Sequence, residues 1–391
     1  MQTDTPLPLA GLKVLELGQL IAGPFAAKTL AEFGADVIKI EAPGSGDPLR
    51  QWRLLKDGTS VWWQVQSRNK RSVALDLKDP AAQDIVRRLA DECDVLVENF
   101  RPGGLEGFGL DPALLMARNP RLIVLRISGY GQTGPYRDKP GFGVVAEAMG
   151  GLRHLTAEPG RTPVRVGVSI GDTLAGLHGV IGVLTALHER QRSGLGQVVD
   201  VALFEAVFNC MESLLPEYSA FGAVRQPAGS ALPGIAPSNA YRCKDGHVLI
   251  AGNGDSIFKR LMTAIGRDDL GQDPALAGNS GRVARVDEID AAIGAWAAPQ
   301  DVADVLKVLD AAAVPAGRIY TVADIAADPH YAARGMLDAI TLSDGTALAV
   351  PGIVPKLSRT PGRHLRNAPT LGQDTADVLA TLRDKPAADT A

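Results

Sequence analysis

The chain's most distinctive candidate for chemistry is Asp172, a carboxylate that stands between two glycine-bearing segments. It opens a long apolar helix predicted over 175–187, in which Gly176, Gly179 and Gly182 recur every third residue. Each glycine costs a helix about 1 kcal/mol relative to alanine, so a helix that carries three lets something approach its backbone closely. An aspartate at this junction either caps the helix or acts as a nucleophile.

Polar side chains also follow a predicted strand in the first half of the chain. The strand over 94–100 (DVLVENF) ends in Asn99 and Phe100, and Arg101 comes directly after it. Because ligands of open α/β sheets bind at the carboxyl ends of parallel strands, these residues are candidates for a binding site.

Two further segments are rich in glycine or in positive charge. The segment over 44–50 (GSGDPLR) is typical of a plain turn. The segment over 68–78 (RNKRSVALDLK) puts three cations beside a short strand. They form either a solvated basic loop, which the sequence favours, or a site for phosphate.

The elements that would position these residues alternate as in an α/β fold. A buried strand is predicted over 12–17 (LKVLEL), a helix over 22–33, and a second strand over 36–41 (DVIKIE). A strand, a helix and a strand within about 30 residues form a βαβ unit, which indicates a parallel sheet. The turn after the first strand (LGQLIAGP) lacks the GxGxxG spacing of a dinucleotide site, which argues against a nicotinamide or flavin enzyme.

The rhythm of strands and helices changes in the middle of the chain, where the segment over 225–238 is rich in Pro, Gly and Ala. We therefore predict a large Rossmann-like domain that begins with 1–218 and a smaller α+β domain with a linker over 219–325. The chain is expected to return to the large domain over 326–391, which includes a C-terminal tail.

The composition is that of an ordinary soluble enzyme. The chain has 391 residues, of which 46% are hydrophobic and 21% charged, and its formal net charge of -4 argues against a nucleic-acid-binding protein. The three cysteines are far apart and form no CxxC pair, so neither a disulfide framework nor a zinc site is expected. The sequence has no signal peptide and no run of about 18 apolar residues, so we expect a cytoplasmic protein with no membrane partner.

Five segments, taken in order, resemble the class III CoA-transferases, the family of formyl-CoA:oxalate CoA-transferase, carnitine CoA-transferase and α-methylacyl-CoA racemase. They are LAGLKVLELGQLIAGPFAAKTLAEFGADVIKIEAPGSGDPLR, RNKRSVALDLKDP, DVLVENFRPG, SGYGQTGP and the stretch around Asp172. The resemblance runs from about Leu9 to about Val378. It implies an α/β fold with a Rossmann-like large domain built from both chain ends, a smaller central α+β domain, and an interlocked homodimer.

The resemblance implies covalent catalysis on coenzyme A thioesters without a metal. Asp172 matches the aspartate nucleophile, which attacks a donor acyl-CoA, forms an anhydride and then an aspartyl-CoA thioester, and passes CoA to an acceptor acid. Gln19 is a candidate polar neighbour of the nucleophile. The positions that match the lining of the thiol arm of CoA are Leu20, Ile21 and Ala22.

Other positions match contacts to the remainder of CoA. Leu75 and Lys78 match residues near the adenosine and its phosphates. Asn99 and Phe100 match contacts to pantetheine and adenine. These residues would bind CoA as a substrate rather than as a resident cofactor.

The sequence departs from the family at two basic CoA contacts. These contacts fall on Ala42 and Gly107, neither of which carries a charge. Arg71 or Arg101 is expected to take their place.

The racemase branch of the family is the main rival interpretation. It uses a His/Asp pair, and the position of that histidine is occupied here by Phe142, with none of the six histidines at the site. His178 lies six residues after Asp172, on the wrong face of the helix for contact. The sequence therefore favours a transferase, while an acyl-CoA hydrolase and a non-catalytic CoA-binding protein remain alternatives.

The acceptor acid cannot be identified from the residues. The SGYGQTGP loop is more similar to the dicarboxylate members than to the formyl-CoA enzyme, so we expect a succinyl-CoA donor and a dicarboxylate acceptor of C4–C6. Arg161 or Arg165 would pair with a substrate carboxylate, or serve only as a surface charge.

Overall fold

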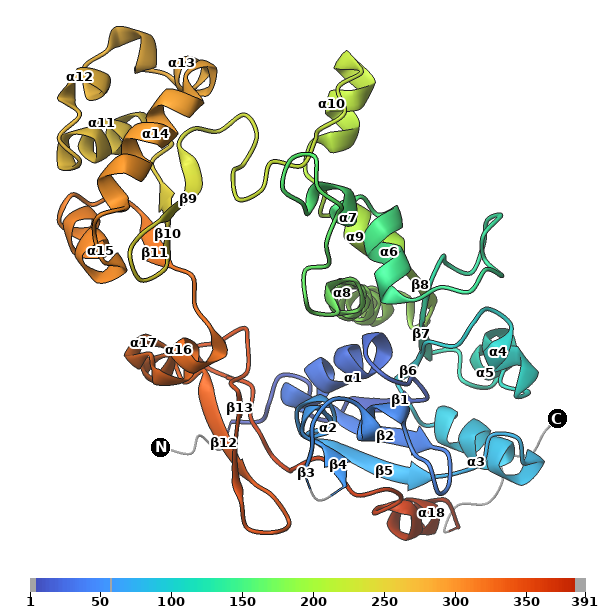
Figure 1. Cartoon of the computed structure of the whole chain (residues 1–391). Helices are drawn as coiled ribbons and strands as arrows, with labels where there is room; N and C mark the ends of the chain where they lie inside the picture. The colour runs from blue at the N-terminus through green and yellow to red at the C-terminus, as the bar shows by residue number, and fades with distance from the viewer. Residues whose placement is uncertain (1–4, 57, 384–391) are drawn as a thin grey trace. The chain divides into compact units, whose positions relative to one another are not determined.

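The computed structural model describes residues 5–56 and 58–383 of the chain (Figure 1). The chain divides into two compact units. Unit 1 comprises Met1–Arg153, Arg165–Glu212 and Ala332–Ala391, and unit 2 comprises His154–Val164 and Ser213–Tyr331. The boundaries predicted from the sequence fell after residues 218 and 325 and did not assign 154–164 to the smaller unit. The predicted tail beyond residue 383 lies outside the described residues.

A six-stranded sheet forms the centre of unit 1. Its strands, in spatial order, are β5 (Lys70–Ala74), β2 (Asp36–Glu41), β1 (Lys13–Glu16), β6 (Val95–Glu98), β7 (Ile123–Ser128) and β8 (Val198–Ala202). Every neighbouring pair is parallel. The predicted α/β fold with a parallel sheet is confirmed. The strand order reverses between β1 and β6, which is the switch point at which doubly wound sheets bind ligands.

Helices cover both faces of this sheet, so both faces are buried. Neighbouring residues of each strand point to opposite faces and therefore belong to different apolar clusters. Val14 and Val95 belong to one apolar cluster, and Leu15 and Leu96 to the other. The first cluster includes residues of α1 (Ala22–Glu32), α6 (Gly143–Met149), α8 (Ile170–Ser193) and α9 (Leu203–Phe208). The second includes residues of α3 (Pro80–Ala90), α4 (Gly104–Gly107), α5 (Pro112–Arg118) and α18 (Thr375–Arg383).

The glycines of α8 allow this helix to lie directly on the core. A Cβ atom on Gly176 would stand 2.9 Å from the carbonyl oxygen of Ala22, and one on Gly179 would stand 2.9 Å from the Leu125 side chain. Side chains at these positions would push α8 away from α1 and β7. The close approach expected from the glycine spacing is therefore made by the protein's own helix and strand, not by a ligand.

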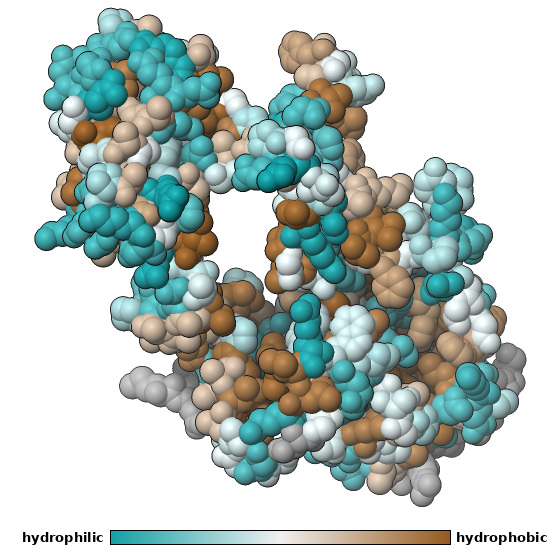
Figure 2. Space-filling view, viewed as in Figure 1, coloured by the Kyte–Doolittle hydropathy of each residue, from teal (hydrophilic) through white to brown (hydrophobic). Residues whose placement is uncertain are grey.

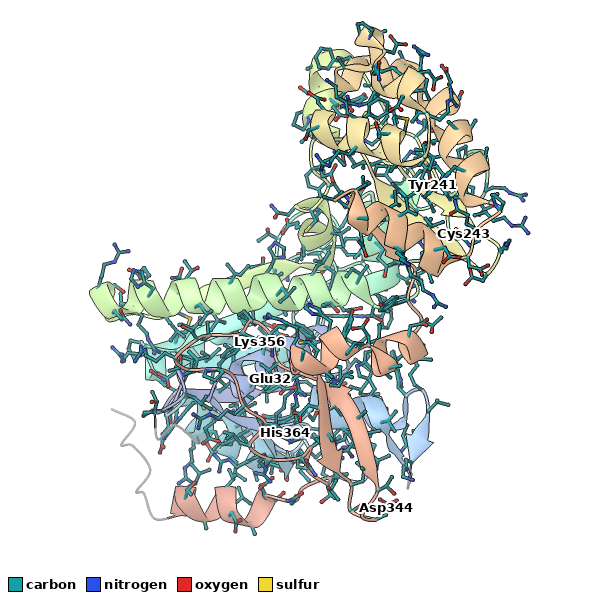
Figure 3. All side chains as sticks on the ribbon, turned by 90° about the vertical axis from the view of Figure 1, so that its left-hand side faces the viewer. Glu32, Tyr241, Cys243, Asp344, Lys356 and His364 are labelled. Carbon is teal, nitrogen blue, oxygen red and sulfur yellow. The ribbon has the colours of Figure 1, made fainter. Side chains whose placement is uncertain are left out.

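Helix α8 is also long and apolar enough, by length and composition alone, to cross a membrane. This corrects the expectation that no segment of the chain would pass that test. One side of α8 packs against α1, β7 and β8, and the helix runs across the sheet in Figure 3.

The C-terminal part of the chain returns to unit 1 and covers the edge strand β5. The N–H group of Ser72 donates to Asp374 Oδ2 at 2.9 Å, and the N–H group of Ala74 donates to Thr375 Oγ1 at 3.0 Å. The antiparallel hairpin of β12 (Leu337–Thr341) and β13 (Ala347–Pro351) belongs to the same part. The remaining elements of unit 1 are η1 (Pro48–Gln51), β3 (Leu55–Lys56), β4 (Thr59–Ser60) and α2 (Val61–Gln66), and α7 (Leu152–Leu155) lies where the chain passes into unit 2.

Unit 2 is an α+β unit with its own core. Its antiparallel sheet consists of β9 (Ser238–Arg242), β10 (His247–Ala251) and β11 (Ala316–Arg318). Tyr241 and Cys243, labelled in Figure 3, are buried in the cluster that this sheet forms with its helices. The helices of this part of the chain are α10 (Leu214–Phe221), α11 (Asp255–Ala264), α12 (Asp268–Gly271), η2 (Pro274–Leu276), α13 (Asn279–Ala284), α14 (Val286–Ala297), α15 (Val302–Ala311), α16 (Val322–Ala327) and α17 (Pro329–Ala333).

Candidate active site

A cavity of about 160 Å³ in unit 1 opens at the switch point of the sheet. It is lined by the turns that follow β1, β6 and β7 and by the beginning of α8. The lining residues are Gln19, Leu20, Ile21, Ala22, Asn99, Phe100, Arg101, Pro102, Ile127, Ser128, Gly129, Arg137, Lys139, Gly141, Phe142, Asp172 and Leu203. The cavity thus contains one carboxylate and three cationic side chains.

Asp172 is the third residue of α8, and its side chain packs against the first residue of α6. A Cβ atom on Gly143 would stand only 2.1 Å from Asp172 Oδ2, so glycine is the residue that fits there. Burial raises the pKa of Asp172 to about 6, and the nearby Glu147 carboxylate contributes to the rise. Among the described residues, no side chain hydrogen-bonds to this carboxylate. A capping aspartate accepts hydrogen bonds from backbone N–H groups of other residues in the first helical turn, whereas Asp172 accepts one from its own N–H group. The nucleophile interpretation is therefore favoured.

Glu147 is a second carboxylate near Asp172, one turn further along α6 from Gly143. It is 1% exposed. Arg165 Nη2 lies 3.3 Å from one of its oxygens and Arg153 Nη2 lies 3.8 Å from the other. Arg165 is near enough to Asp172 to oppose the rise of its pKa.

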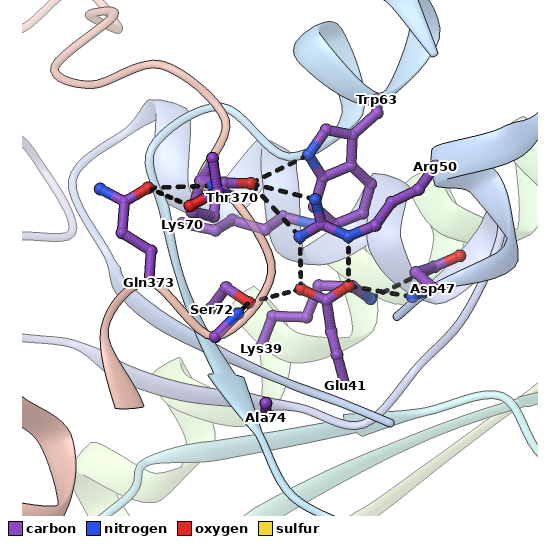
Figure 4. Close-up of polar contacts among 12 residues, drawn as sticks. Lys39, Glu41, Asp47, Arg50, Trp63, Lys70, Ser72, Ala74, Thr370 and Gln373 are labelled. Atoms are coloured by element: carbon purple, nitrogen blue, oxygen red, sulfur yellow. Dashed lines mark hydrogen bonds and ion pairs between the residues drawn. The ribbon is translucent and has the colours of Figure 1, made fainter. Parts of the chain in front are cut away.

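A buried ion-pair network, drawn in Figure 4, hydrogen-bonds to the backbone of the turn after β1. Leu20, which lines the cavity, has a φ of 63° and donates its N–H group to both carboxylate oxygens of Asp47, at 3.1 and 3.2 Å. Lys39 Nζ lies 2.8 Å from Asp47 Oδ2 and donates to the carbonyl oxygen of Gly18 at 2.6 Å. The network therefore fixes both sides of the Gln19–Leu20 turn.

The same network extends to the C-terminal part of the chain. Asp47 N–H donates to Glu41 Oε2 at 2.9 Å, and Glu41 pairs with Arg50 at 2.8 Å. Arg50 and Trp63 both donate to the carbonyl oxygen of Pro369, each at 3.2 Å. The segment 44–50 begins as the expected turn, but its residues Asp47, Leu49 and Arg50 are buried, and Asp47 and Arg50 anchor the site.

Replacing Asp47 with asparagine tests this anchor. Burial by itself raises the pKa of Asp47, but Lys39 and the amides of Leu49 and Leu20 hold it below its ordinary value. Asparagine keeps one acceptor oxygen but removes the charge beside buried Lys39, so the free energy of unfolding should fall by about 2 kcal/mol. The KM for acyl-CoA should rise severalfold, because the turn loses its fixed conformation. Urea denaturation and steady-state kinetics measure both effects; an unchanged KM in the folded variant would contradict the positioning role.

The turns after β1 and β6 are joined by the side chain of Asn99. Its Oδ1 accepts from the Gln19 N–H at 2.7 Å, and its Nδ2 donates to the Gln19 carbonyl at 2.8 Å. Phe100 N–H donates to the buried carboxylate of Glu98 at 2.7 Å, and Arg126 pairs with that carboxylate. Asn99 lines the cavity, but the ends of its amide are used to fix Gln19.

The structure brings eight of the eleven predicted site residues to the cavity. They are Asp172, Gln19, Leu20, Ile21, Ala22, Asn99, Phe100 and Arg101. The other three do not line it: Leu75 belongs to the apolar cluster under the sheet, Lys78 is exposed, and Arg71 pairs with Asp36. Their contacts to CoA stay predictions.

The basic segment 68–78 is not the solvated loop that the sequence favoured. Arg68 is 2% exposed and lies 2.8 Å from the carboxylate of Glu32, which Figure 3 labels. Lys70 is fully buried and lies 2.8 Å from Glu16 Oε2, and burial lowers the pKa of Lys70 to about 8. These cations form structural ion pairs, because the fold brings Glu32 of α1 beside Arg68 and Glu16 of β1 beside Lys70.

The position that distinguishes the racemase branch lies at the cavity. Phe142 lines it, directly before Gly143. His178 points elsewhere, since its Nδ1 lies 2.8 Å from the Leu174 carbonyl and its Nε2 lies 3.3 Å from Asn209 Oδ1. No described histidine is among the residues that line this cavity.

A raised-pKa carboxylate, a cavity at a topological switch point and three nearby cations suit covalent chemistry on an anionic thioester. Comparison with known proteins agrees. The model of the family described as CoA-transferase family III matches residues 9–375. The chain belongs to CoA-transferase family III. The resemblance identified from the five segments is therefore confirmed.

Two of the relatives of this CoA-transferase come from Chloroflexus aurantiacus. It is 46% identical over 379 residues to succinyl-CoA–D-citramalate CoA-transferase, with 96% of this chain and 94% of the relative covered. It is 43% identical over 385 residues to the beta subunit of succinyl-CoA–L-malate CoA-transferase, with 97% and 95% covered. The crystal structure of a CAIB/BAIF family protein from Brucella suis matches with a TM-score of 0.84 at 37% identity, covering 97% of this chain and 100% of that chain.

Sequence reasoning missed three charged residues at the site of this CoA-transferase. Arg137 and Lys139 line the cavity, and buried Glu147 lies near Asp172. Arg137 and Lys139 follow the SGYGQTGP loop, so their position after a strand end was a usable signal. Glu147 gave no signal, because a glutamate in a short helix is usually exposed.

Proposed function

We propose that this enzyme transfers CoA from succinyl-CoA to a small dicarboxylic acid, with Asp172 as the covalent carrier. The observation that carries the proposal is the Asp172 carboxylate, which lines the cavity without a side-chain hydrogen bond among the described residues. A carboxylate in this state is available to attack a thioester. The names of the two Chloroflexus relatives support succinyl-CoA as donor and a C4 or C5 dicarboxylic acid as acceptor.

The proposed reaction proceeds through four displacements at carbonyl carbon. An Asp172 oxygen attacks the thioester of succinyl-CoA and expels the CoA thiolate, which leaves a succinyl-aspartyl anhydride. The thiolate attacks the Asp172 carbonyl carbon, giving an aspartyl-CoA thioester and free succinate. The acceptor carboxylate then attacks that thioester and again expels the thiolate, which attacks the acceptor carbonyl of the new anhydride. Acceptor-CoA leaves and Asp172 is regenerated as a carboxylate.

The cations of the cavity support binding of CoA at this site. Arg101, Arg137 and Lys139 line the cavity together with Asp172. CoA carries phosphates, which guanidinium and ammonium groups bind by charge-assisted hydrogen bonds. We propose that these side chains hold the phosphates while the turn over Gln19–Ala22 lines the thiol arm.

Mass spectrometry of the protein with succinyl-CoA and a panel of acids tests the proposal. CoA should appear on dicarboxylic acids of the panel, and hydroxylamine should trap a modification on Asp172. Loss of thioester without any acceptor would instead favour an acyl-CoA hydrolase. Exchange of the α-hydrogen of a 2-methylacyl-CoA with deuterated water, without movement of CoA between acids, would favour the racemase and contradict the inference from Phe142.

The rate should depend on pH through Asp172. Burial raises the pKa of Asp172 to about 6, and only its ionised form is nucleophilic. We expect kcat/KM to be level above about pH 7 and to fall about tenfold per pH unit below pH 6 as the carboxylate is protonated. A rate profile recorded from pH 5 to pH 8 checks this. A level profile across that range would mean that Asp172 does not control the rate in its ionised form.

We also propose that two copies of the chain associate, as the family resemblance implies. Apolar side chains are exposed on α8 and α9, including Ile181 at 61% and Phe208 at 46%. Figure 2 shows brown, apolar residues at the surface over α6 and α9. Apolar surface of this kind is typical of an interface between subunits. Analytical ultracentrifugation should find a dimer, and a monomer at micromolar concentration would overturn this part of the proposal.

A further inference from the structure

The mechanism described above leaves two arginines beside the nucleophile without a role. Arg153 and Arg165 both approach the buried carboxylate of Glu147, at 3.8 and 3.3 Å. A carboxylate that is 1% exposed requires a cation, but a single arginine would suffice. The second guanidinium therefore gives this region positive charge beyond what Glu147 requires.

In the cluster of Arg153, Glu147 and Arg165, the last two residues lie near enough to the nucleophile to influence its pKa. Asp172 packs on Gly143, the first residue of the helix that carries Glu147. A Cβ atom on Gly171 would stand 3.2 Å from the Gly143 carbonyl oxygen and 3.6 Å from Glu147 Cγ. The beginnings of α6 and α8 are thus in contact, and Glu147 and Arg165 both influence the pKa of Asp172, although neither of them is among the residues that line the cavity.

Arg165 keeps donors available for a ligand. Its side chain is 42% exposed, and its contact with Glu147 uses Nη2 only. A guanidinium has five N–H donors in a planar fork that fits a carboxylate. Within the described part of the chain, Arg153 Nε is buried and has no acceptor. Glu147 holds Arg165 in place through Nη2 and leaves the Nε and Nη1 donors for a ligand.

The charge of the cluster changes during the proposed reaction. With Asp172 ionised, its carboxylate and that of Glu147 balance the two guanidinium groups. Once Asp172 is converted to an anhydride or a thioester it is neutral, and one positive charge remains. The site then attracts an anion at the step at which the acceptor acid must bind.

We propose that Arg165, fixed by Glu147, binds the free carboxylate of the substrate, the one that is not joined to CoA, and so selects dicarboxylic over monocarboxylic acids. The inference rests on the proposed function. Between the two arginines considered from the sequence, it chooses Arg165 because Arg165 contacts Glu147, whereas Arg161 has no ion pair among the described residues.

The test compares isotope exchange between an acyl-CoA and its own free acid for a dicarboxylic and a monocarboxylic pair. The pairs are succinyl-CoA with labelled succinate and butyryl-CoA with labelled butyrate. For Arg165→Gln, kcat/KM with the succinyl pair should fall about 10- to 100-fold, mostly through KM, because a charge-assisted pair is lost. The butyryl pair should change less than about twofold. Arg165→Lys should recover part of the loss, since the charge remains but the planar fork does not.

The control is Arg192→Gln, which removes one positive charge from the exposed last turn of the same helix that carries Asp172. Residue 192 is about 30 Å along α8 from Asp172, so this variant should exchange both pairs like the wild type. Hydroxylamine trapping of Asp172 with butyryl-CoA reports whether Arg165→Gln still forms the covalent intermediate.

Two results would overturn the role of Arg165 while leaving the proposed function intact. The first is an equal loss with both pairs in Arg165→Gln, which would make Arg165 only structural. The second is an unchanged ratio between the pairs. If the wild type exchanges neither pair and no adduct forms on Asp172, the proposed function fails, and the selection of dicarboxylic acids fails with it.

Discussion

Asp172→Asn should lose CoA transfer, with kcat falling by at least about a thousandfold. The amide is nearly the same shape as the carboxylate but is not a nucleophile at neutral pH, so neither the anhydride nor the thioester can form. Transfer is measured by the appearance of acceptor-CoA, and the covalent intermediate by hydroxylamine trapping. Both signals should be absent.

The same substitution should make the protein more stable at neutral pH. Because the pKa of Asp172 is raised to about 6 in the folded state, the ionised carboxylate at pH 7 is less stable in the folded protein than in the unfolded chain. The penalty is absent below the unfolded pKa near 4 and grows as pH rises to about 6, where it reaches about 3 kcal/mol. Urea denaturation should therefore show Asp172→Asn above the wild type at pH 7 and level with it near pH 4.

The control for Asp172→Asn is Asp84→Asn, which changes an exposed aspartate of α3 whose one ion pair within residues 5–56 and 58–383 is with Arg87. It should change neither transfer nor stability by a measurable amount. Residual transfer in Asp172→Asn above a few per cent would mean that the chemistry does not pass through this carboxylate.

Gly143→Ala should lower kcat about 100-fold with little change in stability. The new methyl group would stand 2.1 Å from Asp172 Oδ2, so it must displace that carboxylate. Only the end of a side chain has to move, so α6 and the core stay in place. Displacement of a reacting group by about 1 Å is sufficient to cost this factor.

Kinetics and thermal denaturation of Gly143→Ala should be compared with those of Gly294→Ala. Gly294 lies within α14 of unit 2, and a Cβ atom there meets nothing within 4 Å. That substitution should leave kcat unchanged. If folded Gly143→Ala has wild-type kcat, the Asp172 position described here is not the one that reacts.

The turns after β1 and β6 could be predicted from the sequence. In each of them a run of polar or small residues follows a short apolar strand. Asp172 stood out for a similar local reason, at the start of a glycine-bearing helix. The βαβ order was sufficient to indicate a parallel sheet. These features depend on neighbours in the chain, which the sequence displays directly.

The buried charges could not be predicted, because they depend on which strands become neighbours. Lys39 of β2 lies opposite Glu16 of β1 in register, and Lys70 reaches Glu16 from β5 on the other side of β2. Seen along the chain, these lysines resemble solvent-exposed charges. Glu147 is hidden for a similar reason, since its nearer partner Arg165 lies 18 residues further along the chain.

The cover of β5 has a consequence for synthesis of the chain. The N–H groups of Ser72 and Ala74 obtain their acceptors from Asp374 and Thr375, which are made about 300 residues later. Until then the sheet has an open edge that can pair with another nascent chain. Unit 2 needs only residues up to Tyr331. Unit 2 can therefore finish folding on the ribosome before the segment with Asp374 and Thr375, which covers β5 of unit 1, has been synthesised.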